Sequence, residues 1–78
     1  MSYVNVRVVD PDDNPRRGEK VTIFITHSLF PQTWLEEYTD EDGHAYFDFD
    51  EGLSVDVYVR GEEQLAGVGL DGEVTVCV

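Results

Sequence analysis

Leu53-Ser-Val-Asp-Val-Tyr-Val59 carries an apolar residue at every second position, with polar or aromatic residues between them. Successive side chains of a β-strand point to opposite faces, so this alternation predicts a strand with one buried face. The same period of two runs from Val4 to Val8 and from Val21 to Thr26. Valine, which is stiff at χ1 and fits a pleated surface, dominates the apolar positions. The pattern predicts an all-β fold.

Turn-forming residues separate the predicted strands at intervals of roughly 8–12 residues, the spacing of a sandwich or small barrel. Asp10 to Gly18 is a run of strand breakers and predicts a long loop, whereas Asp40 to Gly43 predicts a tight turn. Further strands are predicted over residues 34–39, 45–49, 64–70 and 74–78. We expect a single seven-stranded antiparallel β-sandwich over residues 1–78, immunoglobulin-like or prealbumin-like in topology.

The last two predicted strands have distinct local signals. Gly67 and Gly69 weaken the strand that contains them, which predicts an edge strand or a bulge. Asp71-Gly72 is a two-residue turn signal and predicts a hairpin between the last two strands. The alternating apolar positions together predict the core, namely Val4, Val6, Val8, Val21, Ile23, Ile25, Phe47, Phe49, Val55, Val57, Val59, Val74 and Val76.

The chain of 78 residues contains 17 Asp and Glu against 5 Lys and Arg, a formal net charge of -12. Phosphate binding needs clustered cations, so the charge argues against a nucleic acid partner and against an anionic membrane surface. The lone Cys77 cannot form an internal disulfide. Residues 2–9 lack the basic start and long apolar run of a signal peptide, and no segment approaches a membrane helix of about 20 apolar residues.

The order of motifs is similar to a carboxypeptidase regulatory-like, transthyretin-like domain and to bacterial immunoglobulin-like modules. The residues that carry the resemblance are Val4-x-Val6-x-Val8-Val9-Asp10, Pro15-x-x-Gly18-x-x-Val21-x-Ile23, Thr39-Asp40-x-x-Gly43-x-Ala45-x-Phe47 and Val55-x-Val57-x-Val59-x-Gly61. The resemblance implies a non-catalytic module that works beside a larger host or partner protein, at the cell surface or after secretion. A Lys–Asn isopeptide cross-link, known in one related group, is not expected, because the last strand contains no Asn.

The sequence offers little for catalysis. A nucleophilic triad needs a Ser or Cys beside a His that a carboxylate orients. His27 closes the second predicted strand and His44 opens the fourth, which places them at opposite ends of an antiparallel sheet. Cys77 has the parity that points away from the core. We therefore expect no enzymatic activity and no cofactor, with calcium as the one metal to consider.

Acidic residues concentrate in the predicted turns. Asp10, Asp12 and Asn14 alternate as in the first half of an EF-hand loop, but Pro15 stands where that loop needs glycine. Strand parity places the loop 10–18, the turn 40–43 and the connection 61–64 at one pole. Metal binding there would use Asp10, Asp12, Asp40 and Asp42, with Glu62 and Glu63 close by. The alternative is that turns favour Asp and that nearby arginines pair with these carboxylates.

Aromatic residues suggest a second kind of site. Phe24, Tyr46 and Tyr58 have the parity that faces away from the core, and Phe24 and Tyr58 are expected to be cross-strand partners. Such an outward stripe fits stacking on sugar rings or anchoring of a protein partner, or the rings stabilise the sheet alone. Trp34, after an apolar loop, is expected either to cover the core or to face a partner.

Three functions therefore compete. The first is a protein-interaction or structural module, the second a calcium-binding module that uses the acidic pole, and the third a carbohydrate-binding module that uses the aromatic stripe.

Overall fold

The computed structural model describes residues 2–27, 32–50, 52, 54–69 and 72–78. Within them the chain forms strands and no helix. The strands are β1 (Ser2–Val9), β2 (Lys20–Thr26), β3 (Thr33–Tyr38), β4 (His44–Phe49), β5 (Ser54–Val59), β6 (Glu62–Val68) and β7 (Gly72–Cys77). Each predicted strand is present, and the all-β prediction is confirmed.

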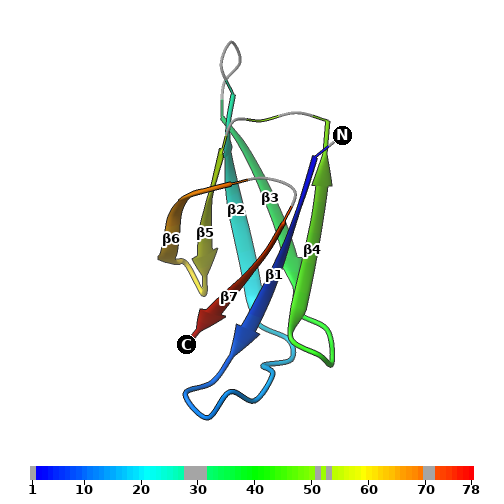
Figure 1. Cartoon of the computed structure of the whole chain (residues 1–78), viewed down its shortest axis with the longest axis vertical. Coiled ribbons are helices and arrows are strands. Elements are labelled where there is room, and N and C mark those ends of the chain that lie inside the picture. Colours follow the sequence, from blue (N-terminus) through cyan, green and yellow to red (C-terminus); the bar gives the residue numbers. More distant parts are fainter. Residues whose placement is uncertain (1, 28–31, 51, 53, 70–71) are drawn as a thin grey trace.

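The strands form two sheets, one with the order β4-β1-β7 and one with the order β3-β2-β5-β6 (Figure 1). Neighbours are antiparallel except β1 and β7, which run parallel from Val4 opposite Gly72 to Val9 opposite Cys77. The prediction of a wholly antiparallel fold was therefore wrong. The predicted β6–β7 hairpin was also wrong, because the chain changes sheets between these strands. A tight hairpin can join only antiparallel strands. A strand that crosses over from the other sheet can instead run parallel to its new neighbour.

The alternating residues of both sheets meet in one hydrophobic core. Val4, Val6 and Val8 of β1 are fully buried, as are the corresponding residues of β2 and β5. The predicted core is confirmed except that Phe49 and Val74 are only partly buried. Each of these two residues lies on an edge strand, where one side lacks a neighbour. Prediction missed Val9 and Ala45, which are 3% and 1% exposed.

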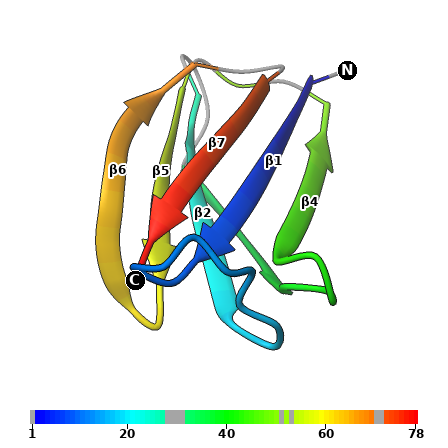
Figure 2. The same ribbon diagram turned by 60° about the horizontal axis from the view of Figure 1, so that its bottom comes forward.

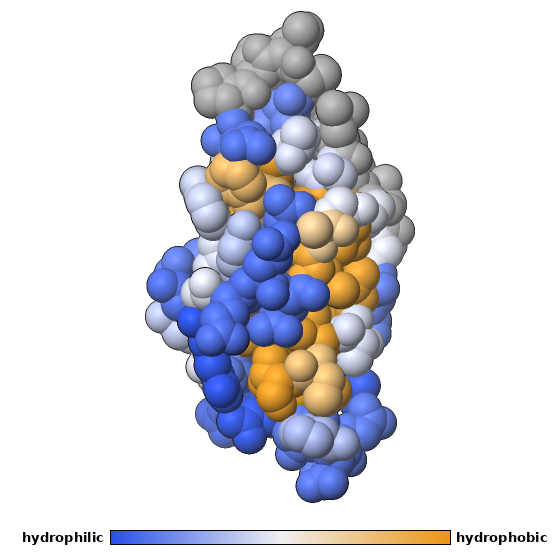
Figure 3. Space-filling view, turned by 90° about the vertical axis from the view of Figure 1, so that its left-hand side faces the viewer, coloured by the Kyte–Doolittle hydropathy of each residue, from blue (hydrophilic) through white to orange (hydrophobic). Residues whose placement is uncertain are grey.

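The side of the molecule that carries β6 and β7 is less well covered. A band of hydrophobic residues reaches the surface on this side (Figure 3). Leu65 and Val68 of β6 and Val74 of β7 are partly buried residues that pack against the core. β6 is an edge strand whose register shifts against β5, and Gly67 has a φ of 65°. The predicted edge or bulged strand is thus confirmed.

Three connections lie at the same end of the two sheets: β1–β2, β3–β4 and β5–β6 (Figure 2). We call this end the loop pole. The parity argument for its assembly is confirmed. Glu62 and Glu63, however, belong to β6 and not to the connection, because the β5–β6 turn ends at Gly61. A tight turn suffices here because β5 and β6 are antiparallel neighbours in one sheet.

Candidate functional site

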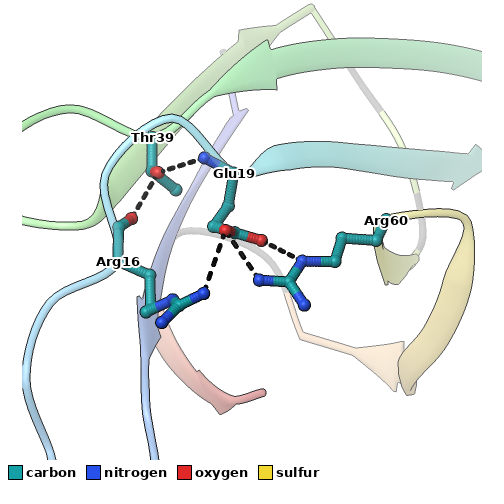
Figure 4. A network of polar contacts seen from close by, with 4 residues as sticks. All are labelled: Arg16, Glu19, Thr39 and Arg60. Atoms are coloured by element: carbon teal, nitrogen blue, oxygen red, sulfur yellow. Dashed lines mark hydrogen bonds and ion pairs between the residues drawn. The ribbon is translucent and has the colours of Figure 1, made fainter.

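The loop pole is held together by the hydroxyl of Thr39. This side chain follows β3 and is 5% exposed. Its Oγ1 accepts a hydrogen bond from the Glu19 amide at 2.8 Å and donates one to the Arg16 carbonyl (Figure 4). Two backbone hydrogen bonds join the same two segments: the Gly18 amide donates to the Thr39 carbonyl at 3.0 Å, and the Thr39 amide donates to the Glu19 carbonyl at 2.9 Å. The β1–β2 loop is therefore fixed against the end of β3.

Glu19 links this loop to the β5–β6 turn. Its carboxylate accepts two hydrogen bonds from the Arg60 guanidinium, one of them 2.8 Å long, and lies 3.6 Å from Arg16 (Figure 4). The Arg60 hydrogen bond is the main cause that lowers the pKa of Glu19, against an opposing effect of burial. Because the Glu19 side chain is only 12% exposed, a planar, two-pronged arginine pair is well suited to it.

Two aspartates cap the turns of the pole. Asp10 Oδ1 accepts hydrogen bonds from the Asp12 and Asn14 amides, both at 2.9 Å. Asp40 Oδ1 accepts the equivalent bonds from Asp42 and His44 at 2.9 and 3.0 Å. These backbone hydrogen bonds lower the pKa of both aspartates, because they favour the ionised carboxyl.

The four aspartates of the calcium prediction thus have different positions. Asp10 and Asp40 accept hydrogen bonds within their own turns, and Asp12 and Asp42 are exposed. In the described part of the chain, no three His, Cys, Asp or Glu side chains lie close enough to hold one metal ion. The pole carries the turn chemistry that was the alternative explanation for its acidic residues, and calcium binding stays a prediction.

The two histidines and the cysteine, the residue types that could act in catalysis, lie in different parts of the structure. His27 follows the end of β2 and its Nε2 lies 3.0 Å from Thr33 Oγ1. His44 opens β4, and its Nδ1 lies 3.1 Å from Asn5 Oδ1. Cys77 is exposed at the end of β7, as its parity predicted. The structure brings no two of these three groups together.

The predicted aromatic stripe is divided between the two sheets. Phe24 of β2 and Tyr58 of β5 lie on the outer face of the four-stranded sheet, whereas Tyr46 of β4 lies on the other sheet and stacks on Tyr3 at 5.8 Å. Phe24 and Tyr58 are not cross-strand partners, because Phe24 is opposite Asp56. The prediction of a single stripe was therefore wrong. Parity assigns a residue to the inner or outer face of a sheet, but it does not say which of the two sheets contains the strand.

Trp34 replaces Tyr46 as the third member on the four-stranded sheet. It lies on β3 opposite Phe24, and their ring centroids are 4.1 Å apart. The Tyr58 ring of β5, two strands away, also lies near the indole, with a centroid distance of 5.8 Å. Trp34 is 57% exposed, so the expectation that it covers the core was wrong. We call Phe24, Trp34 and Tyr58 the aromatic cluster.

Sequence reasoning missed the position of Trp34 although a signal was present. Trp34, Glu36 and Tyr38 alternate with Leu35, and only Leu35 packs against the core. This alternation identifies an outward tryptophan once the segment is treated as a strand. The apolar residues before Trp34 obscured the alternation, because they made the segment look like an apolar loop.

Every Lys and Arg of the chain takes part in an ion pair. Each of the five Lys and Arg residues lies within 4.0 Å of a carboxylate, and the pairs are Arg7–Asp13, Arg16–Glu19, Arg17–Glu41, Lys20–Glu36 and Arg60–Glu19. Four of these five pairs involve the loops or turns of the pole. The acidic surface elsewhere is largely uncompensated.

Comparison with models of protein families, with curated proteins and with solved structures gave no match. Among the described residues, the structure has no helix that is long and apolar enough to cross a membrane.

Proposed function

We propose that this chain is a non-catalytic module that binds a protein partner through the aromatic cluster. The observation that carries the proposal is Trp34, which is 57% exposed yet contacts both Phe24 and Tyr58 through its ring. Neighbouring rings restrict its rotation, so little conformational entropy remains to be lost on binding. Tryptophan held in this way is the residue type most enriched among the energetic centres of protein interfaces.

Charge narrows the kind of partner. Asp56 lies opposite Phe24, and Glu36 lies on the same face of β3 as Trp34. Lys20, 3.3 Å from Glu36, is the cation that neutralises part of this surface. A net charge of -12 attracts a basic surface from a distance. Arginine or lysine on the partner would stack on the indole face, where a cation contributes about 0.5–2 kcal/mol.

The ring geometry favours protein over carbohydrate. Trp34 is tilted by 49° against Phe24 and by 48° against Tyr58. Successive sugar rings of an extended chain need aromatic faces that lie in about the same plane, and this surface offers one such face at most. Irregular side chains of a protein fit tilted rings better. Carbohydrate binding is therefore the second candidate.

Within this proposal the two sheets form a prealbumin-like sandwich, as the transthyretin-like resemblance implies. An immunoglobulin domain has its first two strands adjacent in the same sheet. Here β1 lies beside β4 and β7, and β2 lies beside β3 and β5. The strand order supports the prealbumin-like alternative, in which the module supports or attaches to a larger protein at the cell surface or after secretion.

Site-specific photo-crosslinking tests the proposal. A photoreactive phenylalanine analogue placed at position 34 should capture a partner from native extract, and the same analogue at position 3 is the control. The partner is then purified, and its affinity is measured for Trp34→Ala and Tyr3→Ala. Tyr3 is 38% exposed and lies on β1, so the control variant removes an exposed ring from the other sheet.

We expect Trp34→Ala to weaken binding at least about 30-fold, the effect of a central interface residue, and Tyr3→Ala to change it less than about twofold. Equal loss in both variants, or none in Trp34→Ala, contradicts the proposal. The single Trp of the chain also reports on sugars. Quenching of its fluorescence by an oligosaccharide would favour the carbohydrate alternative.

A further inference from the structure

Two adjoining hollows lie between the edge strands β3 and β4, away from the aromatic cluster. The larger has a volume of about 670 Å³ and an apolar floor that includes Ile25, Leu35 and Phe49. The smaller, of about 160 Å³, shares Leu35 and Asp48 with it and extends past Phe47. We call the two hollows together the edge groove. The floor of the groove is therefore a part of the hydrophobic core that the edges of the two sheets do not cover.

The rim of the edge groove is mainly acidic, although His27 also lines the larger hollow. Asp48 and Asp50 line the larger hollow, and Glu36 and Glu37 line the smaller. Among these four, only Glu36 pairs with a Lys or Arg, namely Lys20, because the four arginines of the chain pair with carboxylates outside the groove. Apolar floor and anionic rim together match a ligand that carries both apolar and cationic groups.

The groove also has free main-chain edges. β3 has β2 as its one neighbour and β4 has β1, so each presents unpaired amides and carbonyls on its outer side within the described residues. Such an edge can accept an added strand. An extended segment places alternate side chains on opposite faces, so apolar residues can enter the groove while the residues between them stay at the rim.

We propose that the edge groove binds an extended, cationic segment of a partner protein. An apolar side chain occupies the larger hollow, and flanking Lys or Arg residues pair with Asp48, Asp50 and Glu37. A second copy of this chain does not fit, because each copy brings a net charge of -12 and acidic edges that repel one another. The site is separate from the aromatic cluster and would add a second point of attachment.

A synthetic peptide provides the probe. We would use a fluorescein-labelled peptide of alternating Lys and Val with one central Phe, and the same peptide with Glu in place of Lys. Fluorescence anisotropy with the full chain measures affinity at about 50 mM and about 200 mM salt, where screening differs clearly. The Lys peptide should bind, weaken with salt, and exceed the Glu peptide at least tenfold.

Matched variants locate the site. Glu37→Gln with Asp48→Asn removes two rim charges, whereas Asp12→Asn with Glu73→Gln removes two exposed charges elsewhere. Two ion pairs correspond to a loss of about tenfold in affinity for the rim variant, with less than about twofold for the control. Amide NMR should place the largest shift changes at Leu35, Asp48 and Phe49.

Three outcomes would overturn the inference: equal weakening in the two double variants, equal binding of the Glu peptide, or shift changes confined to the aromatic cluster. The last of these would support the proposed function while excluding the groove. Conversely, a peptide that binds Trp34→Ala normally and the rim variant poorly supports the groove without bearing on the aromatic cluster.

Discussion

Replacing Thr39 by valine is the sharpest test of how the loop pole is held. Valine has almost the volume of threonine, so the substitution removes the hydroxyl and leaves the packing nearly unchanged. The hydroxyl joins the Glu19 amide, at 2.8 Å, to the Arg16 carbonyl. Both hydrogen bonds are partly buried, and Thr39 itself is 5% exposed.

The magnitude follows from the two bonds. A hydrogen bond contributes about 0.5–1.5 kcal/mol net, and a buried partner left unsatisfied costs about 1–3 kcal/mol. We expect Thr39→Val to lower the free energy of unfolding by about 2–3 kcal/mol. A chain of this length has a total of about 4–12 kcal/mol, so the loss is a large share. Thr39→Ser keeps the hydroxyl and should lose only about 1 kcal/mol, the effect of one methyl group.

Urea denaturation followed by far-ultraviolet circular dichroism measures both variants against the parent chain. The midpoint should fall in the order parent, Ser, Val, with an unchanged slope because the surface exposed on unfolding is the same. A valine variant within about 0.5 kcal/mol of the parent would refute the reasoning. So would a serine variant as unstable as the valine variant, because the methyl group would then be the stabilising part.

Of three further predictions, two address other contacts of the pole, and the third addresses the net charge of the chain. Gly43→Ala should lower the free energy of unfolding by at least about 2 kcal/mol more than Gly61→Ala, as measured by urea denaturation. Both glycines have positive φ, but only at Gly43 would an added Cβ lie 2.6 Å from the Val8 carbonyl oxygen. Glu19→Gln should lower the stability at neutral pH, because Arg60 lowers the pKa of Glu19 in the folded state. The difference in stability between variant and parent should disappear as the pH falls below the usual Glu pKa of 4.5. A difference in melting temperature that stays constant from pH 7 to 3 argues against this role of Glu19. Raising sodium chloride from about 0.05 to about 1 M should raise the melting temperature, because screening weakens repulsion within a chain of net charge -12; a fall in differential scanning calorimetry would mean that the ion pairs dominate.

The strands and the core could be predicted from the sequence because both follow from local alternation. Val4, Val6 and Val8 are buried because a pleated strand separates odd from even positions, whichever strand lies beside it. The same holds for the outward direction of Phe24 and Tyr46. Local information suffices for such statements.

The sheet assignment was not predictable in this way. Whether β7 pairs with β6 or β1 depends on where the chain crosses between the sheets, and Asp71-Gly72 carries no signal for that choice. Alternation likewise gives the outward direction of a residue but not the sheet to which its strand belongs. Because β4 pairs with β1, Tyr46 stacks on Tyr3, and because β3 pairs with β2, Trp34 lies beside Phe24 and Tyr58. The edge groove depends on the approach of β3 and β4 from different sheets, which alternation does not report.

The run Thr39-Asp40-x-x-Gly43-x-Ala45-x-Phe47 shows why a motif can indicate a fold and leave the function open. Its specified positions all serve folding. Thr39 joins two loops, Asp40 caps the turn, and the backbone of Gly43 packs where a Cβ would collide with β1, while Ala45 and Phe47 enter the core. The unspecified positions point outward, and one of them holds Tyr46 beside the edge groove. Trp34 lies outside the run altogether. A partner-binding surface built from such positions can change without disturbing the fold, so the motif has no means of reporting it.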